Sequence, residues 1–464
     1  MDIGVTRRGF VAGLAGAAAS LPAFAQRGRF GPGPTPFGAV PSARQLAWHQ
    51  LEATAFLHFG IATFTDKEWG YGDDDPNLFQ PARFDADAII EGLAAANLRG
   101  VVLTCKHHDG FCLWPTKTTE YSVRASSWRG GQGDVVRDIA AAARRRNMKF
   151  GINLSPWDRN SAAYGTPAYI NIYRQQLTEL LTNYGPVFEL WHDGANGGDG
   201  YYGGAREKRT IDKRTYYDWG NTCELVHKLQ PDAVIFSDAG PDVRWVGNMR
   251  GIAGDPCWAT YDPTAGDDDH SQELATGTEH GTKWMPAECE VSIRPGWFWH
   301  ASETARVKTP RQLANLYYLS AGRGANLMLS VPPTSDGLID AADVGSLRGF
   351  GDYLRQTFGS PVAAVTPRGP ANPQVVVLDL PPDSQFNVVR IREEIRFGQR
   401  IEGITVERLE NETWKPVATA TSVGPRRIIR LPEPVSGSKA RLTVTQASAR
   451  AIISEFALFR EAAL

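Results

Sequence analysis

Side chains that could bind or attack a polyhydroxylated ligand follow a series of short apolar segments in this sequence. The clearest case is residues 187–197, VFELWHDGANG, where an apolar run ends in Trp191, His192 and Asp193 before a glycine. A carboxylate is costly to bury alone, so Asp193 must meet polar partners, water or a substrate. Imidazole, indole and carboxylate groups recur after other apolar runs, and they complete the candidate site: His58, Glu68, Trp69, His107, His108, Trp157, Glu288 and Glu290.

The elements that must position these residues alternate between about residues 50 and 350. Apolar runs occur at 54–60, 100–105, 149–154, 187–191, 233–236, 284–290 and 326–331. Apolar residues at helical spacing predict helices at 84–98, 134–147, 168–184, 215–229 and 309–319. This alternation is typical of a parallel sheet covered on both faces. It favours a TIM-like (β/α)₈ barrel over residues 43–358, whose strands would carry functional side chains at their carboxyl ends.

The pattern changes after residue 356. Residues 373–461 contain alternating, β-branched segments with turn residues between them and no long helix. Such a pattern predicts a C-terminal antiparallel β-sandwich, which we place at residues 359–464 as an accessory domain. The predicted fold class is therefore an α/β barrel followed by an all-β sandwich.

The N-terminus has the features of an export signal. Residues 1–25 combine a basic start, an apolar stretch and an Ala23-Phe24-Ala25 cleavage site. Arg7-Arg8 give the stretch a twin-arginine pattern, although a general secretory signal is the alternative. Pro and Gly crowd the segment that follows, which predicts a disordered lead-in at 26–42. We expect a periplasmic or secreted protein with no membrane span in the mature chain.

Composition excludes several classes of partner. Of the 464 residues, 42% are hydrophobic and 22% charged, as in a soluble globular protein, and the net charge is −2. Neither nucleic acid nor an anionic membrane is expected to bind such a chain. The five cysteines match no zinc pattern, and the chain has no H-E-x-x-H helix. A metal hydrolase built on the adjacent histidines is thus a rival interpretation only, and we predict no metal and no cofactor.

Each candidate also has a structural interpretation. One of His107 and His108 could bond a loop carbonyl, the tryptophans could be core lids, and Asp193 could brace a histidine. Only one of Glu288 and Glu290 is expected to face the pocket.

The motifs carrying these residues resemble the α-L-fucosidases of glycoside hydrolase family 29. The matching stretches are HFG at 58–60, EW at 68–69, KHHDGF at 106–111, WHDG at 191–194 and PAECEVSIRPGWFWH at 286–300. The resemblance extends into the C-terminal sandwich and implies a retaining enzyme that acts on fucosylated oligosaccharides. By that likeness Asp193 is the nucleophile, and His58, Glu68, Trp69, His107, His108, Trp157 and Trp191 bind the sugar.

One position departs from the family pattern. In the branched α1,3/1,4-specific subgroup, which the chain most resembles, the general acid/base is expected in a G-P-D-x-R-W-x-G-N-E stretch. Here the stretch reads GPDVRWVGNM, so Met249 replaces the glutamate, and methionine has no proton to donate. Glu288 is the preferred replacement, Glu290 the second choice, and Asp255 or another loop acid a third.

Two alternatives to a fucosidase follow. Met249 favours a lectin-like protein that binds fucosides without cleaving them efficiently. A related exo-glycosidase that acts on a different sugar would also use the same pocket chemistry.

Overall fold

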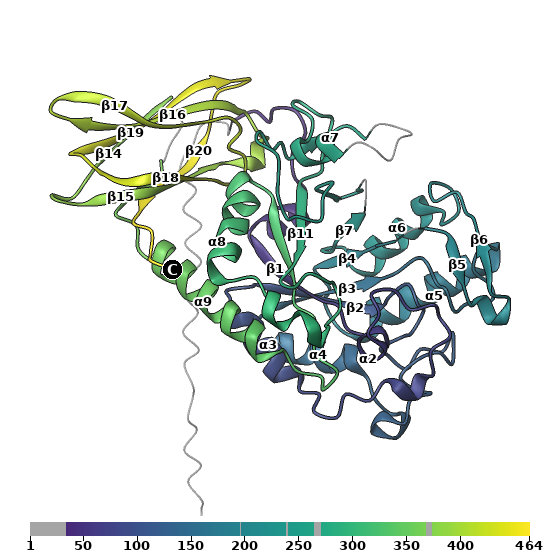
Figure 1. The fold of residues 1–464 in the computed structure, drawn as a ribbon. Coiled ribbons are helices and arrows are strands. Elements are labelled where there is room, and N and C mark those ends of the chain that lie inside the picture. The colour runs from purple at the N-terminus through teal and green to yellow at the C-terminus, as the bar shows by residue number, and fades with distance from the viewer. Residues whose placement is uncertain (1–33, 195, 238–239, 264–270, 368–373) are drawn as a thin grey trace, which may run out of the picture. The chain divides into compact units, whose positions relative to one another are not determined.

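A closed parallel barrel carries the candidate residues (Figure 1). The computed structural model describes residues 34–194, 196–237, 240–263, 271–367 and 374–464. The eight barrel strands follow one another around the barrel in the order β1-β12-β11-β8-β7-β4-β3-β2. They are β1 (Ala53–Leu57), β2 (Gly100–Lys106), β3 (Lys149–Leu154), β4 (Glu189–Trp191), β7 (Val234–Ser237), β8 (Val243–Trp245), β11 (Ala287–Ser292) and β12 (Asn326–Ser330). The predicted (β/α)₈ barrel is confirmed.

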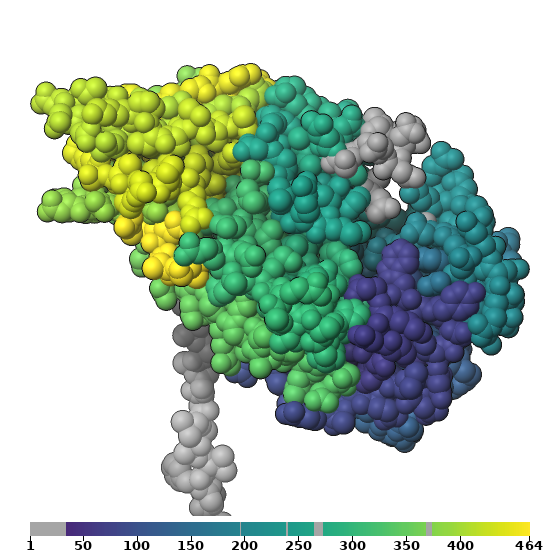
Figure 2. All heavy atoms as spheres, viewed as in Figure 1, coloured from purple at the N-terminus to yellow at the C-terminus, as the bar shows by residue number. Residues whose placement is uncertain are grey.

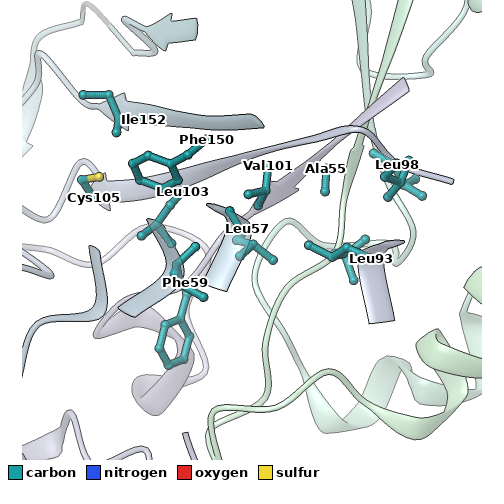
Figure 3. Packing of buried hydrophobic residues seen from close by; sticks show 14 of the residues in the cluster. Ala55, Leu57, Phe59, Leu93, Leu98, Val101, Leu103, Cys105, Phe150 and Ile152 are labelled. Carbon is teal, nitrogen blue, oxygen red and sulfur yellow. The ribbon is translucent and has the colours of Figure 1, made fainter. Parts of the chain in front are cut away.

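Alternate residues of a barrel strand face opposite sides of the sheet. Ala55 and Leu57 of β1 pack with Leu93 in the layer between strands and helices (Figure 3). Phe56, between them, belongs instead to a cluster inside the barrel, which we call the interior layer: Trp48, Phe56, Val102, Trp191, Val234, Phe236, Val243 and Met328. Because most of these residues precede the carboxyl ends of their strands, the interior layer fills the barrel beneath the candidate site.

Helices pack against the outside of the barrel strands: α3 (Ala86–Ala95), α4 (Val135–Arg145), α5 (Pro167–Asn183), α6 (Trp219–Leu229), α8 (Pro310–Leu319) and α9 (Ala341–Phe358). α1 (Ala43–His49) instead contributes Trp48 to the interior layer, and α2 (Ala62–Thr65) and α7 (Ser271–Thr276) are short helices between strands. Local sequence explains their starts. Asp134 caps α4 by accepting from the Arg137 amide at 2.8 Å, and Thr309 with Gln312 forms a capping box at the start of α8.

One barrel strand, β8, was not predicted from the sequence. It has three residues, and its central residue is Arg244, so it lacks the apolar run that marks the other strands. The Arg244 side chain is fully buried and donates to the carbonyl oxygens of Leu274 and Trp258, each at 2.9 Å. These bonds satisfy the guanidinium inside the fold, and they could not be foreseen from the local sequence.

The C-terminal region contains two four-stranded antiparallel sheets, as predicted. One sheet has the order β13-β20-β15-β18 and the other β14-β19-β16-β17. Their bounds are β13 (Ala363–Val365), β14 (Val375–Asp379), β15 (Gln385–Glu393), β16 (Ile401–Glu410), β17 (Thr413–Ala420), β18 (Arg427–Ser436), β19 (Lys439–Ala447) and β20 (Ile453–Phe459). Their inward residues form a second core, in which Val389 and Phe456 pack with Val406 and Leu442. Two short ribbons, β5 (Gly198–Gly200) with β6 (Glu207–Arg209) and β9 (Thr260–Tyr261) with β10 (Lys283–Trp284), lie outside the barrel and the sandwich.

Charged side chains join the sandwich to the barrel. Figure 2 shows the atoms of these two regions in contact. Arg426 is fully buried, and its Nη1 lies 3.0 Å from Oε1 of Glu52, the residue before β1. Arg392 of β15 lies 2.6 Å from the same carboxylate. Burial alone would raise the pKa of Glu52, but these two guanidinium groups lower it far below its ordinary value. The carboxylate is therefore ionised and holds the two domains together.

The predicted export signal, residues 1–25, lies outside the described residues. The last part of the predicted lead-in has defined contacts: the Phe37 amide donates to the Phe397 carbonyl at 2.9 Å, and Arg400 donates to the Thr35 carbonyl at 2.6 Å. Within the described ranges, no helix has the length and apolar character needed to cross a membrane.

Candidate active site

Three histidines lie at the carboxyl ends of β1 and β2. His58 follows β1, and His107 and His108 follow β2; all three are buried. Nδ1 of His58 is 2.8 Å from the Ser330 hydroxyl at the end of β12, and Nδ1 of His108 is 2.7 Å from the Ser155 hydroxyl after β3. The His107 and His108 rings are 4.0 Å apart between centroids. The serine contacts fix two of the rings and leave Nε2 of each for another partner.

These imidazoles are neutral. Burial lowers the pKa of His58 and of His108 to about 3, and it lowers the pKa of His107 well below its usual value. A neutral imidazole offers one N–H donor and one acceptor nitrogen. Such a pair matches sugar hydroxyls, each of which donates and accepts.

Two indole rings border His108. The Trp69 ring lies edge-on to His108 at 5.2 Å and to Trp157 at 5.9 Å between centroids. Trp157 is buried, and its Nε1 donates to the Tyr202 hydroxyl at 2.9 Å. Trp69, in contrast, is 53% exposed. An exposed aromatic face next to polar groups is suited to contact with the apolar face of a sugar.

Glu68 is held by a segment between β11 and α8. Its carboxylate accepts from the amides of Trp297 at 2.9 Å and Phe298 at 3.2 Å, and it lies 2.7 Å from Nε2 of His300. The same segment approaches the histidines, because the Trp297 ring lies 5.3 Å from His58 and the Phe298 ring 4.9 Å from His107. These three residues belong to the PGWFWH stretch, which the sequence analysis used as a motif without assigning them a place in the site.

Asp193 is half-buried and lies two residues beyond the end of β4. A carboxylate oxygen of Asp193 and a ring nitrogen of each of His107 and His108 lie within 4.8 Å of one another. The following residue, Gly194, has φ +73°, and a Cβ there would lie 2.1 Å from the His108 ring. Glycine is therefore required after Asp193, because any side chain would displace the histidine.

Trp191 does not lie among the exposed groups of the site. It is 1% exposed and belongs to the interior layer, where its ring stacks on Phe236 at 3.5 Å between centroids. Its Nε1 donates to Glu288 Oε2 at 3.1 Å and to Glu189 Oε1 at 3.3 Å. Trp191 is the last residue of β4 and its side chain points into the barrel, so its contact with sugar stays a prediction.

Glu288 lies equally deep. It is fully buried, pairs in register with Asn326, the first residue of β12, and accepts from the same Trp191 N–H as the carboxyl of Glu189. Burial and the neighbouring Glu189 raise the pKa of Glu288 well above its ordinary value. Its carboxyl lies on the second residue of β11, bonded by the indole of Trp191 inside the barrel, and not at the carboxyl end of the strand. This depth does not favour Glu288 as the proton donor.

Glu290 shares the inward face of β11 with Glu288, since residues two apart on a strand point the same way. The outward residue between them, Cys289, packs with Ala287 and Ala325. Glu290 is half-buried and lies one step nearer the carboxyl end of the strand. Of the two glutamates, only Glu290 is therefore at the level of the site.

The other acid positions considered from the sequence lie elsewhere. Met249 is 62% exposed, in a turn where the Asn248 side chain accepts from the Arg250 and Ile252 amides at 3.2 and 3.3 Å. Asp255 is bound by Arg427 of the sandwich at 2.7 and 2.9 Å. Burial would raise the pKa of Asp255, but the hydrogen bonds and charge of Arg427 lower it below its ordinary value. Asp255 is thus an ionised interface residue and not a proton donor.

Among the residues that the structure describes, two groups of side chains have the spacing to hold a metal ion. One is His107, His108 and Asp193 in the site, and the other is Glu279, His280 and Glu402 outside it. Neutral imidazoles and a carboxylate equally suit hydrogen bonding to a polyol, so the first group does not require a metal. The second group is mostly exposed.

Comparison with known proteins agrees with this geometry. Residues 37–358 match the family model described as alpha-L-fucosidase. The chain is 39% identical to alpha-L-fucosidase 1 of Arabidopsis thaliana, over 93% of this chain and 89% of that protein. It resembles the structure of a glycoside hydrolase 29 family member from an unknown rumen bacterium, with TM-score 0.87 and 40% identity over 92% of this chain and 78% of that one. It also resembles a Ruminococcus gnavus GH29 fucosidase solved in complex with fucose, with TM-score 0.80 and 30% identity over 93% and 97% of the two chains.

Proposed function

We propose a mechanism and a location for this chain, which belongs to the α-L-fucosidase family of glycoside hydrolases, family 29, and is itself an α-L-fucosidase. In this proposal it is an exported, retaining exo-enzyme that removes terminal fucose through a covalent fucosyl–enzyme. The observation that carries the proposal is the place of Asp193. Its carboxylate projects beyond β4, beside His107 and His108, where a sugar bound by those imidazoles would present its anomeric carbon.

In this mechanism Asp193 is the nucleophile. A retaining glycosidase attacks the anomeric carbon with an ionised carboxylate, and a second carboxyl about 5 Å away protonates the leaving oxygen. Water then cleaves the covalent intermediate, and the second carboxyl takes the proton from it. Gly194 supports the role of Asp193, because the absence of a side chain there lets His108 lie against the backbone that carries the nucleophile.

The fucose hydroxyls are bound by the neutral imidazoles of His58, His107 and His108 together with the carboxylate of Glu68. Trp69 and Trp157 contact the apolar face of the ring. The bonds from Ser330 and Ser155 fix the orientation of His58 and His108 before substrate arrives, so little reorganisation accompanies binding.

Glu290 is the acid/base in our proposal. It is the inward glutamate of β11 that lies nearest the strand end, whereas Glu288 is buried under Trp191 and Asp255 is bound by Arg427. This order reverses the preference drawn from the sequence. The exposed methionine at 249 favours one second candidate function, a protein that binds fucosides but cleaves only those whose leaving group departs without a proton.

Substrate class and export complete the proposal. The GPDVRWVGNM stretch supports the branched α1,3/1,4-linked subgroup, and Arg7-Arg8 support twin-arginine export to the periplasm or beyond. Export predicts a mature N-terminus after Ala25 in the periplasmic fraction. Changing both arginines to lysine should retain the full-length precursor inside the cell; if it does not, twin-arginine export is excluded.

The test of function is fucose release by the purified mature chain from a branched α1,3/1,4-fucosylated oligosaccharide and from an aryl fucoside. Release from both supports the full mechanism. Release from the aryl fucoside alone supports the second candidate, and no release with measurable binding makes the protein a lectin. Asp193→Asn is the matched control: it keeps the shape of the side chain, so loss of all turnover with unchanged melting temperature supports the nucleophile assignment.

A further inference from the structure

A pair of carboxyl groups lies inside the barrel beneath the proposed nucleophile. Glu189 is the first residue of β4 and Glu288 the second of β11, and neither is exposed. Both carboxyl groups accept from the same N–H, that of Trp191 Nε1, which brings their oxygens close together. Two ionised carboxylates so close together in a buried site repel each other, and a proton on one of them removes that repulsion.

The same pair holds one indole. Trp191 Nε1 donates to both carboxyls, at 3.3 Å to Glu189 and 3.1 Å to Glu288. On its other sides the indole packs on Phe236 and lies 4.9 Å from the Phe56 ring between centroids. Trp191 is the last residue of β4 and lies two residues before Asp193. The orientation of this ring therefore affects the backbone that presents the nucleophile.

The surroundings of the pair are polar as well as buried. Asn326, the register partner of Glu288, and Asn153, the register partner of Trp191, are both fully buried. Within the described residues, Oδ1 of Asn326, both side-chain polar atoms of Asn153, Oε2 of Glu189 and Oε1 of Glu288 have no hydrogen-bond partner. Buried polar groups in folded proteins are paired with protein or with ordered water, so this part of the barrel is suited to hold water.

We propose that Glu189 and Glu288 share one proton in the working enzyme and act as a positioning pair, holding Trp191 and through it the end of β4 that carries Asp193. The link to catalysis rests on the proposed role of Asp193; the shared proton does not. Burial raises the pKa of Glu189 to about 7, and burial with the charge of Glu189 raises that of Glu288. Glu290, on the same strand, also raises the pKa of Glu288, so the pair responds to the ionisation of the acid above it.

The test separates a positioning pair from a proton donor. Glu288→Gln replaces a buried carboxyl by a neutral group that can still donate to Glu189 and accept from Trp191. Its kcat should stay within about fivefold of wild type on both substrates, the effect of one ordinary hydrogen bond. Glu288→Met keeps the volume but removes both bonds, and a misplaced nucleophile should then lower kcat by about 10²-fold with less change in KM.

The pH profile gives a readout that a merely structural role would not move. In wild type acting on the aryl fucoside, whose leaving group departs without the proton of Glu290, rising pH removes the shared proton, the two carboxylates repel, and kcat falls on the alkaline side. In Glu288→Gln there is no shared proton to lose, so this decline should move to higher pH. Glu393→Gln is the control: Glu393 is another buried glutamate, whose pKa burial raises to about 7, but it lies in the sandwich, so the pH profile of kcat should not change.

Three outcomes overturn the proposal. A 10²–10⁴-fold loss in Glu288→Gln on the oligosaccharide, with the aryl fucoside spared, would make Glu288 the acid. Wild-type kcat and pH profile in Glu288→Met would remove any positioning role. On the aryl fucoside, an alkaline decline in Glu288→Gln at the wild-type pH would exclude the shared proton, even if Glu288→Met does not fold. Failure of the nucleophile assignment appears separately, as residual turnover in Asp193→Asn.

Discussion

Glu290→Gln should abolish most turnover of the natural substrate while sparing substrates that need no acid. Loss of general acid assistance typically costs 10²–10⁴-fold, which is about 2.7–5.4 kcal/mol of transition-state stabilisation. We expect that loss in kcat/KM for the branched oligosaccharide, and a loss of less than about tenfold for an aryl fucoside, whose leaving group departs without a full proton. Glutamine at position 290 has the same shape as the half-buried glutamate and can still form hydrogen bonds, so the fold should be unchanged.

A second change in the same chain sharpens the experiment. Met249 is 62% exposed, so Met249→Glu should alter stability by less than about 0.5 kcal/mol. An exposed glutamate keeps an ordinary pKa near 4.3, so about one in six such groups is protonated at pH 5 and about one in fifty at pH 6.

If position 249 reaches the leaving group, Glu290→Gln with Met249→Glu should regain oligosaccharide turnover at pH 5 and about eightfold less at pH 6. Glu290→Gln with Met249→Gln is the matched control and should regain none. The assay is fucose release from both substrates at the two pH values. Oligosaccharide turnover by Glu290→Gln within about fivefold of wild type would refute the assignment of Glu290, because one lost hydrogen bond accounts for that much.

Three further predictions concern binding, pH and the domain interface. Trp69→Ala should raise KM about 2–10-fold with little change in melting temperature, because the ring is 53% exposed; an unchanged KM would exclude its contact with sugar. Burial and Arg426 lower the pKa of His49 to about 3, so the unfolded chain binds a proton there below pH 6.5 that the folded chain does not. This difference in proton binding lowers the free energy of unfolding as pH falls, by at most about 2.7 kcal/mol at pH 4.5. His49→Gln should remove that part of the decline, measured by urea unfolding. An equal decline in wild type and in His49→Gln would contradict this role of His49. Asp255→Asn should lower the free energy of unfolding by about 1–2 kcal/mol in the same assay, because it leaves the buried Arg427 without its charge partner. An unchanged free energy of unfolding would mean that the ion pair contributes nothing to joining the domains.

The barrel could be predicted because most of its strands are marked by local sequence. Runs such as GVVLTC and NLMLSV are apolar on both faces, as strands between helices and a filled interior must be. β8 could not, because its central arginine is satisfied by carbonyl groups of Leu274 in α7 and of Trp258, which lie far from β8 in the sequence. The sandwich strands were visible for a different reason: their alternation reflects one buried and one solvated face, as in the pattern of β14.

The candidate site could be predicted in part for a related reason. In a parallel barrel the carboxyl ends of all strands meet, so residues that follow apolar runs are near one another wherever they lie in the sequence. His58, His107, His108 and Asp193 fit this rule. Glu68 does not follow a strand directly, and its partners Trp297, Phe298 and His300 come from a loop whose path depends on the whole fold.

Depth along a strand is what sequence motifs did not reveal. Residues two apart on a strand share a face but differ in height by about 6.6 Å. On β4 and its extension this step separates Trp191, packed in the interior layer, from Asp193 beside the histidines. On β11 it separates Glu288, bonded beneath the indole, from Glu290. In both motifs, WHD and ECE, two side chains on one face of a strand therefore differ in height, and height along the strand is our reason for preferring Glu290 over Glu288 as the proton donor.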